Sequence, residues 1–558
     1  MDIKSVQTEL KKQKITARLF TLGNMFINED ILDSENRILE LTNFTGSYGI
    51  FLVTQTKSYL FIDGRYEIQA SREVNLKKVE LVKLSTINFF DWLKQNFAKS
   101  PIKISYNPWV ISISYLKKLS STLPNATFIP IEKENRLVSD NKVKVFTHSK
   151  KYTGYVSKDK IADFARFIKK QGLDAYLITS ASNSSWLLNH RSNALQYTPI
   201  FRAYVLVEKT GSYKVFAHNT DFPKALSFDT LKDHIANYEK IASDFKTTPS
   251  IISSYNSKLT HKPDEITNLK SIKNSTELKG TKNAHIRDGV AVCKFLYWLS
   301  KNYKEKTEMD LAQKLLSYRK KELNFHSESF ATIAGFGENS AVIHYHATPK
   351  TNATIKKNSV LLLDSGAQYY DGTTDVTRTI AIGTPSSDMI EKNTLVLKAH
   401  IAIASSIFPK DTCGNELDLI ARQSLLKNNL DYEHGTGHGV GLFSNVHEGP
   451  CSISIKAKNS APLKPGMVTS IEPGVYKEKL FGIRIENLYY VKQTKNPKYL
   501  SFEVLTLIPL DKTLINKYML TPEEIAFVNN YHHQVFLSLK KYLTKQELEW
   551  LKASCSPL

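Results

Sequence analysis

The chain has 558 residues, of which 41% are hydrophobic and 23% are charged, a composition that excludes disordered and fibrous proteins and predicts several globular domains. Lys and Arg number 75 against 54 Asp and Glu, and the resulting charge of +21 raises nucleic acid or an anionic membrane as a partner. The lysines are scattered along the whole chain without a basic block, so a solvated basic surface is favoured instead.

The cysteines and the apolar segments of the sequence indicate the cellular compartment of the protein. The four cysteines lie far apart and form no CxxC pair, which argues for a reducing compartment and against a disulfide framework or a zinc ribbon. The first residues lack the apolar core of a signal peptide, and no run approaches the ~18 apolar residues of a membrane span. We therefore expect a cytoplasmic protein without a membrane segment. The cysteines are Cys293, Cys413, Cys451 and Cys555.

Two successive units of alternating helical and strand patterns come first. In residues 1–150, the segment 53–62 predicts two strands around a polar turn. In residues 151–272, Ser157 is a candidate N-cap for an amphipathic helix that stops near Gly172. Both units contain an apolar strand, a polar turn and a second strand, which fits a repeat, although this element is common enough to recur by chance.

A polar stretch precedes the rest of the chain. Residues 247–275 contain two prolines and many Ser, Asn and Lys residues, which is typical of a linker. From Glu277 onward, apolar residues recur at helical spacing. We therefore predict three domains, at residues 1–150, 151–272 and 273–558.

Two aspartates stand beside strand-like runs in the third domain. An apolar run leads into Asp364, and strand character resumes at 374–382, which carries Asp375. Asp371-Gly372 between them is a strong turn signal, so a hairpin across these 11 positions would bring both carboxylates to one place. Taken alone, the two aspartates would be interpreted as ordinary turn residues.

A glycine-rich segment contributes three histidines. Residues 434–441 (HGTGHGVG) alternate glycine with imidazole and small side chains, which lets the backbone approach a ligand and lets side chains converge. A nucleotide loop is disfavoured, because the GxGxxG and GxxxxGKS/T spacings are absent. A single histidine is more often a core residue than a ligand, but His434, His438 and His447 within 14 residues favour a site.

Two glutamates and an arginine form a third cluster. Glu472 follows an apolar run, and in a strand over 481–487 the side chains of Arg484 and Glu486 share the face opposite two isoleucines. Buried charges must pair or bind a ligand. An Arg484–Glu486 structural pair is the alternative interpretation, but it leaves Glu472 unexplained.

Charge balance favours a site for two metal ions. Four carboxylates that converge without cations repel one another, and their pKa values rise until some are protonated. Two divalent cations supply four positive charges and leave such a site neutral. Oxygen ligands with one imidazole suit Mn²⁺, with Zn²⁺, Co²⁺ and Fe²⁺ as alternatives. The four carboxylates counted here are those of Asp364, Asp375, Glu472 and Glu486.

These motifs resemble those of a known family. Their order and spacing agree with aminopeptidase P, or Xaa-Pro aminopeptidase, in its long three-domain cytosolic form. A weaker resemblance extends to residues 44–49 and 63–66, where Phe61-Ile62 stands in place of an expected Trp-Thr pair, so the share of the first domain in the site stays open. The matching segments are 335–345, 364–379, 434–450, 470–476 and 481–487.

The resemblance implies a fold and an activity. The expected fold class is α/β (α+β), with a C-terminal pita-bread catalytic domain preceded by two creatinase-N-like α/β domains. The expected activity is a metalloaminopeptidase that hydrolyses the N-terminal Xaa-Pro bond with a hydroxide bridging two divalent metal ions, Mn²⁺ being usual in the family. Expected partners are peptides with proline at position two and a second copy of the chain, as a homodimer, without nucleic acid or membrane.

The resemblance also suggests roles for single residues. Asp364 would bind one metal ion and His438 with Glu472 the other, while Asp375 and Glu486 would bridge both. Glu472 is in addition the expected proton shuttle. Catalytic or substrate-binding roles are expected for His344 and His447, which would stabilise the tetrahedral intermediate or position the substrate, for His434, which would line the pocket, and for Arg484, which would orient Glu486.

Three alternatives stay open. The first alternative is another pita-bread enzyme. A prolidase-like dipeptidase would be recognised by its preference for dipeptides, whereas a methionine aminopeptidase is disfavoured because these enzymes lack the long N-terminal extension. A non-catalytic pita-bread binding module would have lost its metal ligands, whereas all five ligand positions are filled here. Nucleic-acid binding rests only on the charge of +21.

Overall fold

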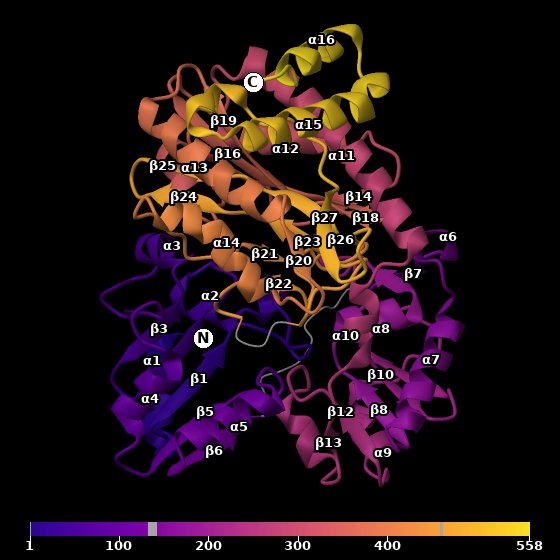
Figure 1. Cartoon of the computed structure of the whole chain (residues 1–558). Helices are drawn as coiled ribbons and strands as arrows, with labels where there is room; N and C mark the ends of the chain where they lie inside the picture. Colours follow the sequence, from indigo (N-terminus) through magenta and orange to yellow (C-terminus); the bar gives the residue numbers. More distant parts are fainter. Residues whose placement is uncertain (1, 132–141, 458–460) are drawn as a thin grey trace. The chain divides into compact units, whose positions relative to one another are not determined.

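The computed structural model describes residues 2–131, 142–457 and 461–558 (Figure 1). The chain folds into two compact units, which we call the N-terminal unit (Met1–His148, Tyr155–Leu195 and Pro199–Ile266) and the C-terminal unit (Ser149–Gly154, Gln196–Thr198 and Thr267–Leu558). All four cysteines are free thiols, as predicted. Among the helices of the described segments, none combines the length and the apolarity that a membrane span requires.

A six-stranded sheet in the order β4-β3-β2-β1-β5-β6 forms the first part of the N-terminal unit. The predicted strand pair at 53–62 is confirmed as the antiparallel hairpin β2–β3, although β2 already begins at Ile50. Both faces of the sheet are buried, because Phe51 packs into one core and Leu52 into another. The elements are β1 (Ala17–Thr21), β2 (Ile50–Thr54), β3 (Ser58–Ile62), β4 (Glu80–Lys83), β5 (Ile102–Tyr106), β6 (Ala126–Pro130), α1 (Ile3–Gln13), α2 (Arg37–Thr42), α3 (Glu67–Glu73), α4 (Phe89–Phe97) and α5 (Ile113–Thr122).

A five-stranded sheet in the order β11-β10-β8-β12-β13 follows. The predicted helix is α7 (Ser157–Lys170), but Val156 occupies the N-cap, so the capping role of Ser157 was wrong by one residue. Gly172 follows this helix with a φ of 68°, as expected for a helix stop. The polar stretch predicted as a linker is itself ordered, since it contains β13 and α10. The other elements are β7 (Val145–Thr147), β8 (Ala175–Ile178), β9 (His190–Ser192), β10 (Ala203–Glu208), β11 (Tyr213–Ala217), β12 (Ile241–Ser243), β13 (Thr260–His261), α8 (Ala181–Leu188), α9 (Leu231–Ile235) and α10 (Glu265–Ser271).

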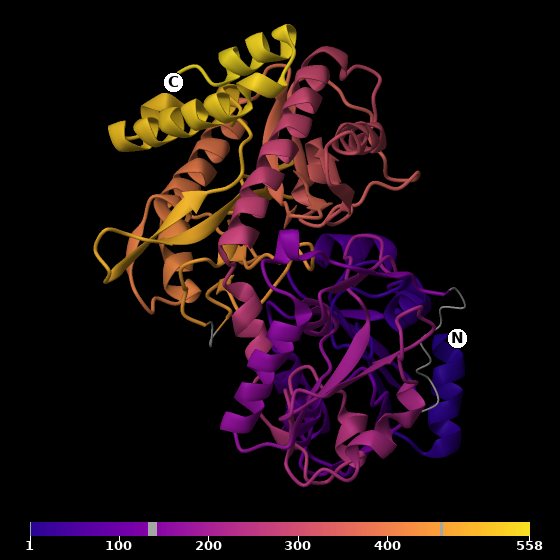
Figure 2. The same cartoon turned by 90° about the vertical axis from the view of Figure 1, so that its right-hand side faces the viewer.

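The longest helix of the C-terminal unit is α11 (Ser275–Asn302), near the position predicted for it. Asn274 caps this helix by accepting the amide N–H groups of Thr276 and Glu277, and Glu277 accepts the N–H of Asn274 in return. In Figure 2, α11 runs alongside the strands of this unit and contacts α15 and α16. The other helices are α6 (Lys150–Thr153), α12 (Glu308–Arg319), α13 (Ser387–Ala404), α14 (Gly414–Leu426), α15 (Pro522–Leu539) and α16 (Lys545–Ser554).

Antiparallel sheets make up the rest of the C-terminal unit. Their strand orders are β14-β17-β18, β15-β16-β19 and β20-β27-β26-β23, with the pairs β21-β22 and β24-β25 beside them. The strands are β14 (Phe325–Glu328), β15 (Ile333–Phe336), β16 (Ser359–Ser365), β17 (Ala367–Tyr369), β18 (Gly372–Thr373), β19 (Val376–Ile382), β20 (Ile407–Pro409), β21 (Gly437–His438), β22 (Ser452–Ile453), β23 (Val468–Ile471), β24 (Gly474–Lys477), β25 (Phe481–Arg484), β26 (Asn487–Gln493) and β27 (Tyr499–Val504).

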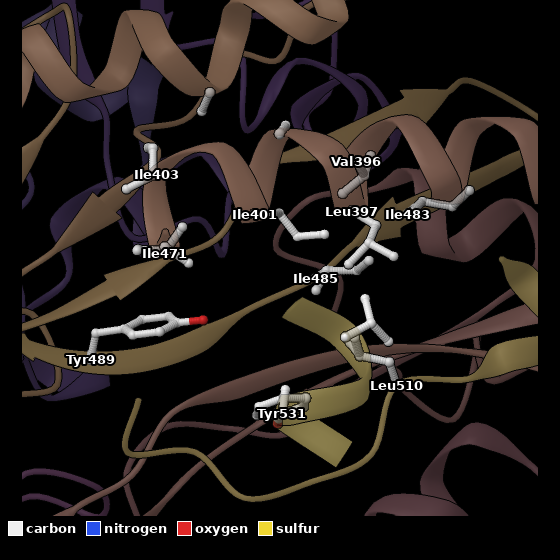
Figure 3. Close-up of a cluster of buried hydrophobic side chains, with 14 of the residues drawn as sticks. Val396, Leu397, Ile401, Ile403, Ile471, Ile483, Ile485, Tyr489, Leu510 and Tyr531 are labelled. Atoms are coloured by element: carbon white, nitrogen blue, oxygen red, sulfur yellow. The ribbon is translucent and has the colours of Figure 1, made fainter. Parts of the chain in front are cut away.

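A large apolar core anchors the strands that carry the predicted site. Figure 3 shows Ile471, Ile483 and Ile485 packed in one buried cluster with side chains of α13. Each of these isoleucines is fully or almost fully buried. Because side chains alternate along a strand, this packing turns the neighbouring charged residues away from the core. The predicted alternation over 481–487 is thereby confirmed, although the predicted strand is divided, since β25 ends at Arg484 and β26 begins at Asn487.

Candidate metal centre

Neighbouring strands carry the two predicted aspartates. Asp364 lies near the end of β16, and Asp375 directly precedes β19, which pairs antiparallel with β16. The register places Asp364 opposite Thr377, so the predicted hairpin does bring the two aspartates together. Asp375 is 4% exposed, and Asp364 is also buried.

Close backbone approach explains the glycines around His438. A Cβ atom at Gly437 would lie 2.1 Å from the carbonyl oxygen of Ser470, and one at Gly439 would lie 2.1 Å from that of Glu448. Only glycine fits at these positions. Ser470 then fixes His438, because its hydroxyl accepts the His438 N–H at 3.0 Å.

The two glutamates reach the same place from different strands. Glu472 follows β23, and its Oε1 accepts the Ser470 hydroxyl at 3.2 Å. Glu486, 2% exposed, follows β25 and accepts the Thr377 hydroxyl through Oε2 at 2.7 Å. Thr377 lies on β19, two residues after Asp375, so this bond ties the glutamate to the aspartate hairpin.

Four of the five predicted ligands form one cluster. Ligand atoms of Asp375, His438 and Glu486 all lie within 4.8 Å of one another. Nε2 of His438 is 3.4 Å from Oδ2 of Asp375 and 3.5 Å from Oε1 of Glu472. The fifth residue, Asp364, joins them through Arg484.

Arg484 differs from its predicted role. Its Nη2 donates to Oδ2 of Asp364 at 2.5 Å, and its Nε donates to the Thr377 hydroxyl at 3.1 Å. Glu486 is therefore reached only through Thr377, and the alternative Arg484–Glu486 pair does not form between these two described side chains. β25 packs against β16 and β19, and this packing places Arg484 beside Asp364.

The tautomer of His438 suits a metal ligand. Nδ1 lies 3.0 Å from the carbonyl oxygen of Gly439, and a carbonyl can only accept, so Nδ1 carries the proton. The lone pair of Nε2 then faces the carboxylates. Metal-binding histidines are commonly oriented by such a bond from the second ring nitrogen.

The electrostatics of the cluster call for cations. Burial raises the pKa of Asp364 to about 6, and the nearby Asp375 and Glu472 add to the rise. Burial and neighbouring carboxylates also raise the pKa of Glu472, and raise that of Glu486 far above its usual range. In addition, Oδ1 of Asp364 and Oδ1 of Asp375 are buried without a hydrogen-bond partner. A donor set of this kind fits two divalent cations.

The three other predicted histidines lie in different settings. His434 is buried, with Nε2 2.8 Å from the Tyr476 hydroxyl, which also accepts from Arg484 at 2.6 Å. His447 is exposed, and its ring centroid lies 4.4 Å from that of His438. His344 is half-buried in the turn after the 3₁₀ helix at Gly337–Ala341.

Some residues of this network were not predicted. Tyr476 links His434 to Arg484, and Thr377 links Arg484 to Glu486. Arg378 donates to the carbonyl oxygen of Glu486 at 2.7 Å and so fixes the backbone of that ligand. Thr377 could have been found from strand alternation, since it shares a face with Asp375.

The chain matches known protein families over almost its whole length. Residues 279–493 match metallopeptidase family M24, and residues 498–558 match the C-terminal region of that peptidase. Residues 3–138 and 137–277 each match a creatinase/prolidase N-terminal domain.

Similar proteins cover nearly the full chain. Xaa-Pro aminopeptidase 1 of Dictyostelium discoideum is 33% identical over 607 residues, which cover 100% of this chain and 96% of that protein. A probable Xaa-Pro aminopeptidase P of Laccaria bicolor is 34% identical, covering 98% of this chain and 92% of that protein. The crystal structure of X-prolyl aminopeptidase from Caenorhabditis elegans, a cytosolic enzyme with a di-nuclear active site, matches with a TM-score of 0.91 at 30% identity, covering 98% of this chain and 95% of that chain.

These matches confirm the resemblance to aminopeptidase P and the expected fold class. The chain therefore belongs to metallopeptidase family M24, as a mixed α/β protein with creatinase-type N-terminal domains and a C-terminal pita-bread domain.

Proposed function

We propose that this protein is a metalloaminopeptidase that removes the N-terminal residue of peptides with proline at position two. The observation that carries the proposal is the buried cluster of carboxylates around Nε2 of His438, whose charge two divalent cations would neutralise. When bound, these cations would hold the attacking hydroxide and polarise the scissile carbonyl.

The residues divide the binding of the two ions between them. We assign Asp364 to one ion, His438 and Glu472 to the other, and Asp375 and Glu486 to both. The oxygen-rich set favours Mn²⁺, with Zn²⁺ and Co²⁺ as alternatives. Arg484 keeps Asp364 in place through the 2.5 Å bond and balances part of its charge.

The remaining groups handle the proton and the substrate. Glu472 is half-buried, less enclosed than Glu486, so it is placed to accept a proton from the attacking water and pass it to the leaving amine. His447, exposed beside His438, and His344 are assigned to the substrate carbonyl. His434 lines the pocket, held by Tyr476, which donates to its Nε2 while accepting from Arg484.

We also propose a cytoplasmic homodimer with domains at 1–150, 151–272 and 273–558. Three apolar side chains of α14, Leu419, Ile420 and Leu426, are exposed, and we assign them to the contact between the two copies. Light scattering is expected to give twice the mass of the chain, and replacing Leu419 by lysine is expected to shift the protein toward the monomer. A monomeric wild-type protein would contradict the homodimer.

One assay tests metal dependence and substrate class together. Protein stripped with a chelator is expected to leave an Arg-Pro-Pro peptide intact and to cleave it after Mn²⁺ is added. A matched peptide with alanine at position two is expected to remain uncleaved. Faster cleavage of an Xaa-Pro dipeptide would favour a prolidase, and metal uptake without any turnover would favour a non-catalytic module.

A further inference from the structure

A buried carboxylate outside the metal centre is built into the loop that contains His344. Glu308, the first residue of α12, is 0% exposed. Among the described residues, no Lys, Arg or His nitrogen lies within ion-pair distance of it. An ionised carboxylate buried without a cation is costly unless hydrogen bonds replace its water.

Four donors satisfy this carboxylate, and all come from one loop. The loop, which we define as residues 336–353, begins at the last residue of β15 and leads toward β16. Oε1 of Glu308 accepts the Phe336 N–H at 2.7 Å, and Oε2 accepts the Ala353 N–H at 2.8 Å. The Tyr345 hydroxyl donates to Oε2 at 2.7 Å, and the Asn339 amide donates to both oxygens at 3.1 and 3.3 Å.

The same loop is fixed a second time, on the side of the metal centre. The Ser340 hydroxyl accepts the Gly482 N–H at 2.7 Å. Gly482 lies on β25, two residues before Arg484. His344 therefore sits between two anchors, Ser340 on β25 and Tyr345 on Glu308, in a loop whose only described regular element is one short 3₁₀ helix.

We propose that Glu308 is a positioning residue, which fixes the loop 336–353 and thereby places His344 for the reaction. The inference rests on the proposed function, in which His344 meets the substrate carbonyl. The carboxylate suits this task because its two oxygens accept from both ends and the middle of the loop at once. Its place in the first turn of α12 also stabilises its charge through the helix dipole.

The test uses two variants and a control in the full-length protein. Glu308→Gln keeps the size of the side chain but offers an N–H₂ group where Ala353 N–H or Phe336 N–H needs an acceptor. Tyr345→Phe removes the Tyr345–Glu308 bond beside His344, together with the contacts of the same hydroxyl with Thr351 and Asn339. Glu305→Gln, an exposed glutamate three residues earlier, is the control and is expected to behave like wild type.

Two readouts separate positioning from general stability. Hydrogen exchange of residues 337–353 is expected to speed up about tenfold or more in Glu308→Gln, with the metal-binding strands unchanged. Turnover of the proline peptide is expected to fall about 10- to 100-fold, as misplacement of a reacting group predicts, while two metal ions per chain remain bound. In a protein that already carries His344→Ala, the Glu308→Gln change is expected to lower turnover no further.

Several outcomes would overturn the proposal. Unchanged exchange of the loop in Glu308→Gln would do so whether or not the protein cleaves peptides. Losses of turnover that multiply in the Glu308→Gln, His344→Ala double variant would also overturn it, as would a His344→Ala protein with full activity. A wild-type protein that does not cleave proline peptides would contradict the proposed function instead. Hydrogen exchange of residues 337–353 would then still decide whether Glu308 holds the loop.

Discussion

Replacing Asp375 by asparagine is expected to abolish peptide cleavage and, at the same time, to stabilise the protein when metal is absent. The loss of turnover follows from removing a ligand assigned to both ions. Metal catalysis contributes several kcal/mol to transition-state stabilisation, so the rate is expected to fall by at least about 10³-fold. The side chain keeps its shape, so the fold itself has no steric reason to change.

The opposite effect on stability follows from charge repulsion. Without cations, Asp375 raises the pKa of Asp364 and of Glu486, which means that the charged forms are held at a free-energy cost. The pKa of Asp364 rises from 3.8 to about 6 on folding, so the metal-free protein loses stability as the pH rises through that interval. Asparagine removes one of the charges responsible and adds an N–H₂ donor among acceptors.

Calorimetry at pH 7 with and without Mn²⁺ measures both effects. In the presence of a chelator, the melting temperature of Asp375→Asn is expected to lie above that of wild type. In excess Mn²⁺ it is expected to lie below that of wild type, because only wild type is stabilised by metal binding. Asp411→Asn is the matched control, since Asp411 is exposed and has a φ of 69°, which asparagine tolerates. An Asp375→Asn protein with full activity would contradict the bridging role.

Local geometry made part of the site predictable. The segment 481–487 alternates between core and site because successive side chains of extended chain point to opposite faces, and Ile483 packs in the core while Arg484 does not. The hairpin of Asp364 and Asp375 was predictable from an apolar run, a turn signal and a second strand. These inferences need only neighbours along the chain.

Long-range partners were not predictable in this way. The Arg484–Asp364 bond joins residues 120 positions apart, and no local pattern distinguishes this partner from Glu486. Glu308 reads in the sequence as an ordinary acidic residue in the first turn of a helix, and its partners lie up to 45 positions away. The choice of His438 as the metal-binding histidine came from resemblance, because convergence of distant segments leaves no periodic signal.

The second large effect is expected at Glu448, which follows His447. Two buried lysines hold this buried glutamate, Lys273 at 2.8 Å from Oε1 and Lys270 at 3.2 Å from Oε2. Glu448→Gln removes the negative charge that pairs with both ammonium groups, and is expected to cost about 3–5 kcal/mol in the free energy of unfolding. Burial alone would raise the pKa of Glu448, but the two lysines outweigh it and lower that pKa, so this stabilisation is lost as the pH falls below the usual range of a glutamate.

The pattern among variants distinguishes this ion network from mere packing. Lys273→Met alone leaves Glu448 paired with Lys270, so it is expected to lower the free energy of unfolding by less than Glu448→Gln does. Replacing both lysines leaves the buried carboxylate without either ammonium group, and is expected to lower the free energy of unfolding by as much as Glu448→Gln does. Adding Glu448→Gln to that double variant is expected to restore part of the loss, because no unpaired charge then remains. Glu433→Gln serves as control, since Glu433 and Lys456 form an exposed pair worth about 1 kcal/mol or less. Losses that simply add across the variants in urea unfolding would show that the three charges do not act together.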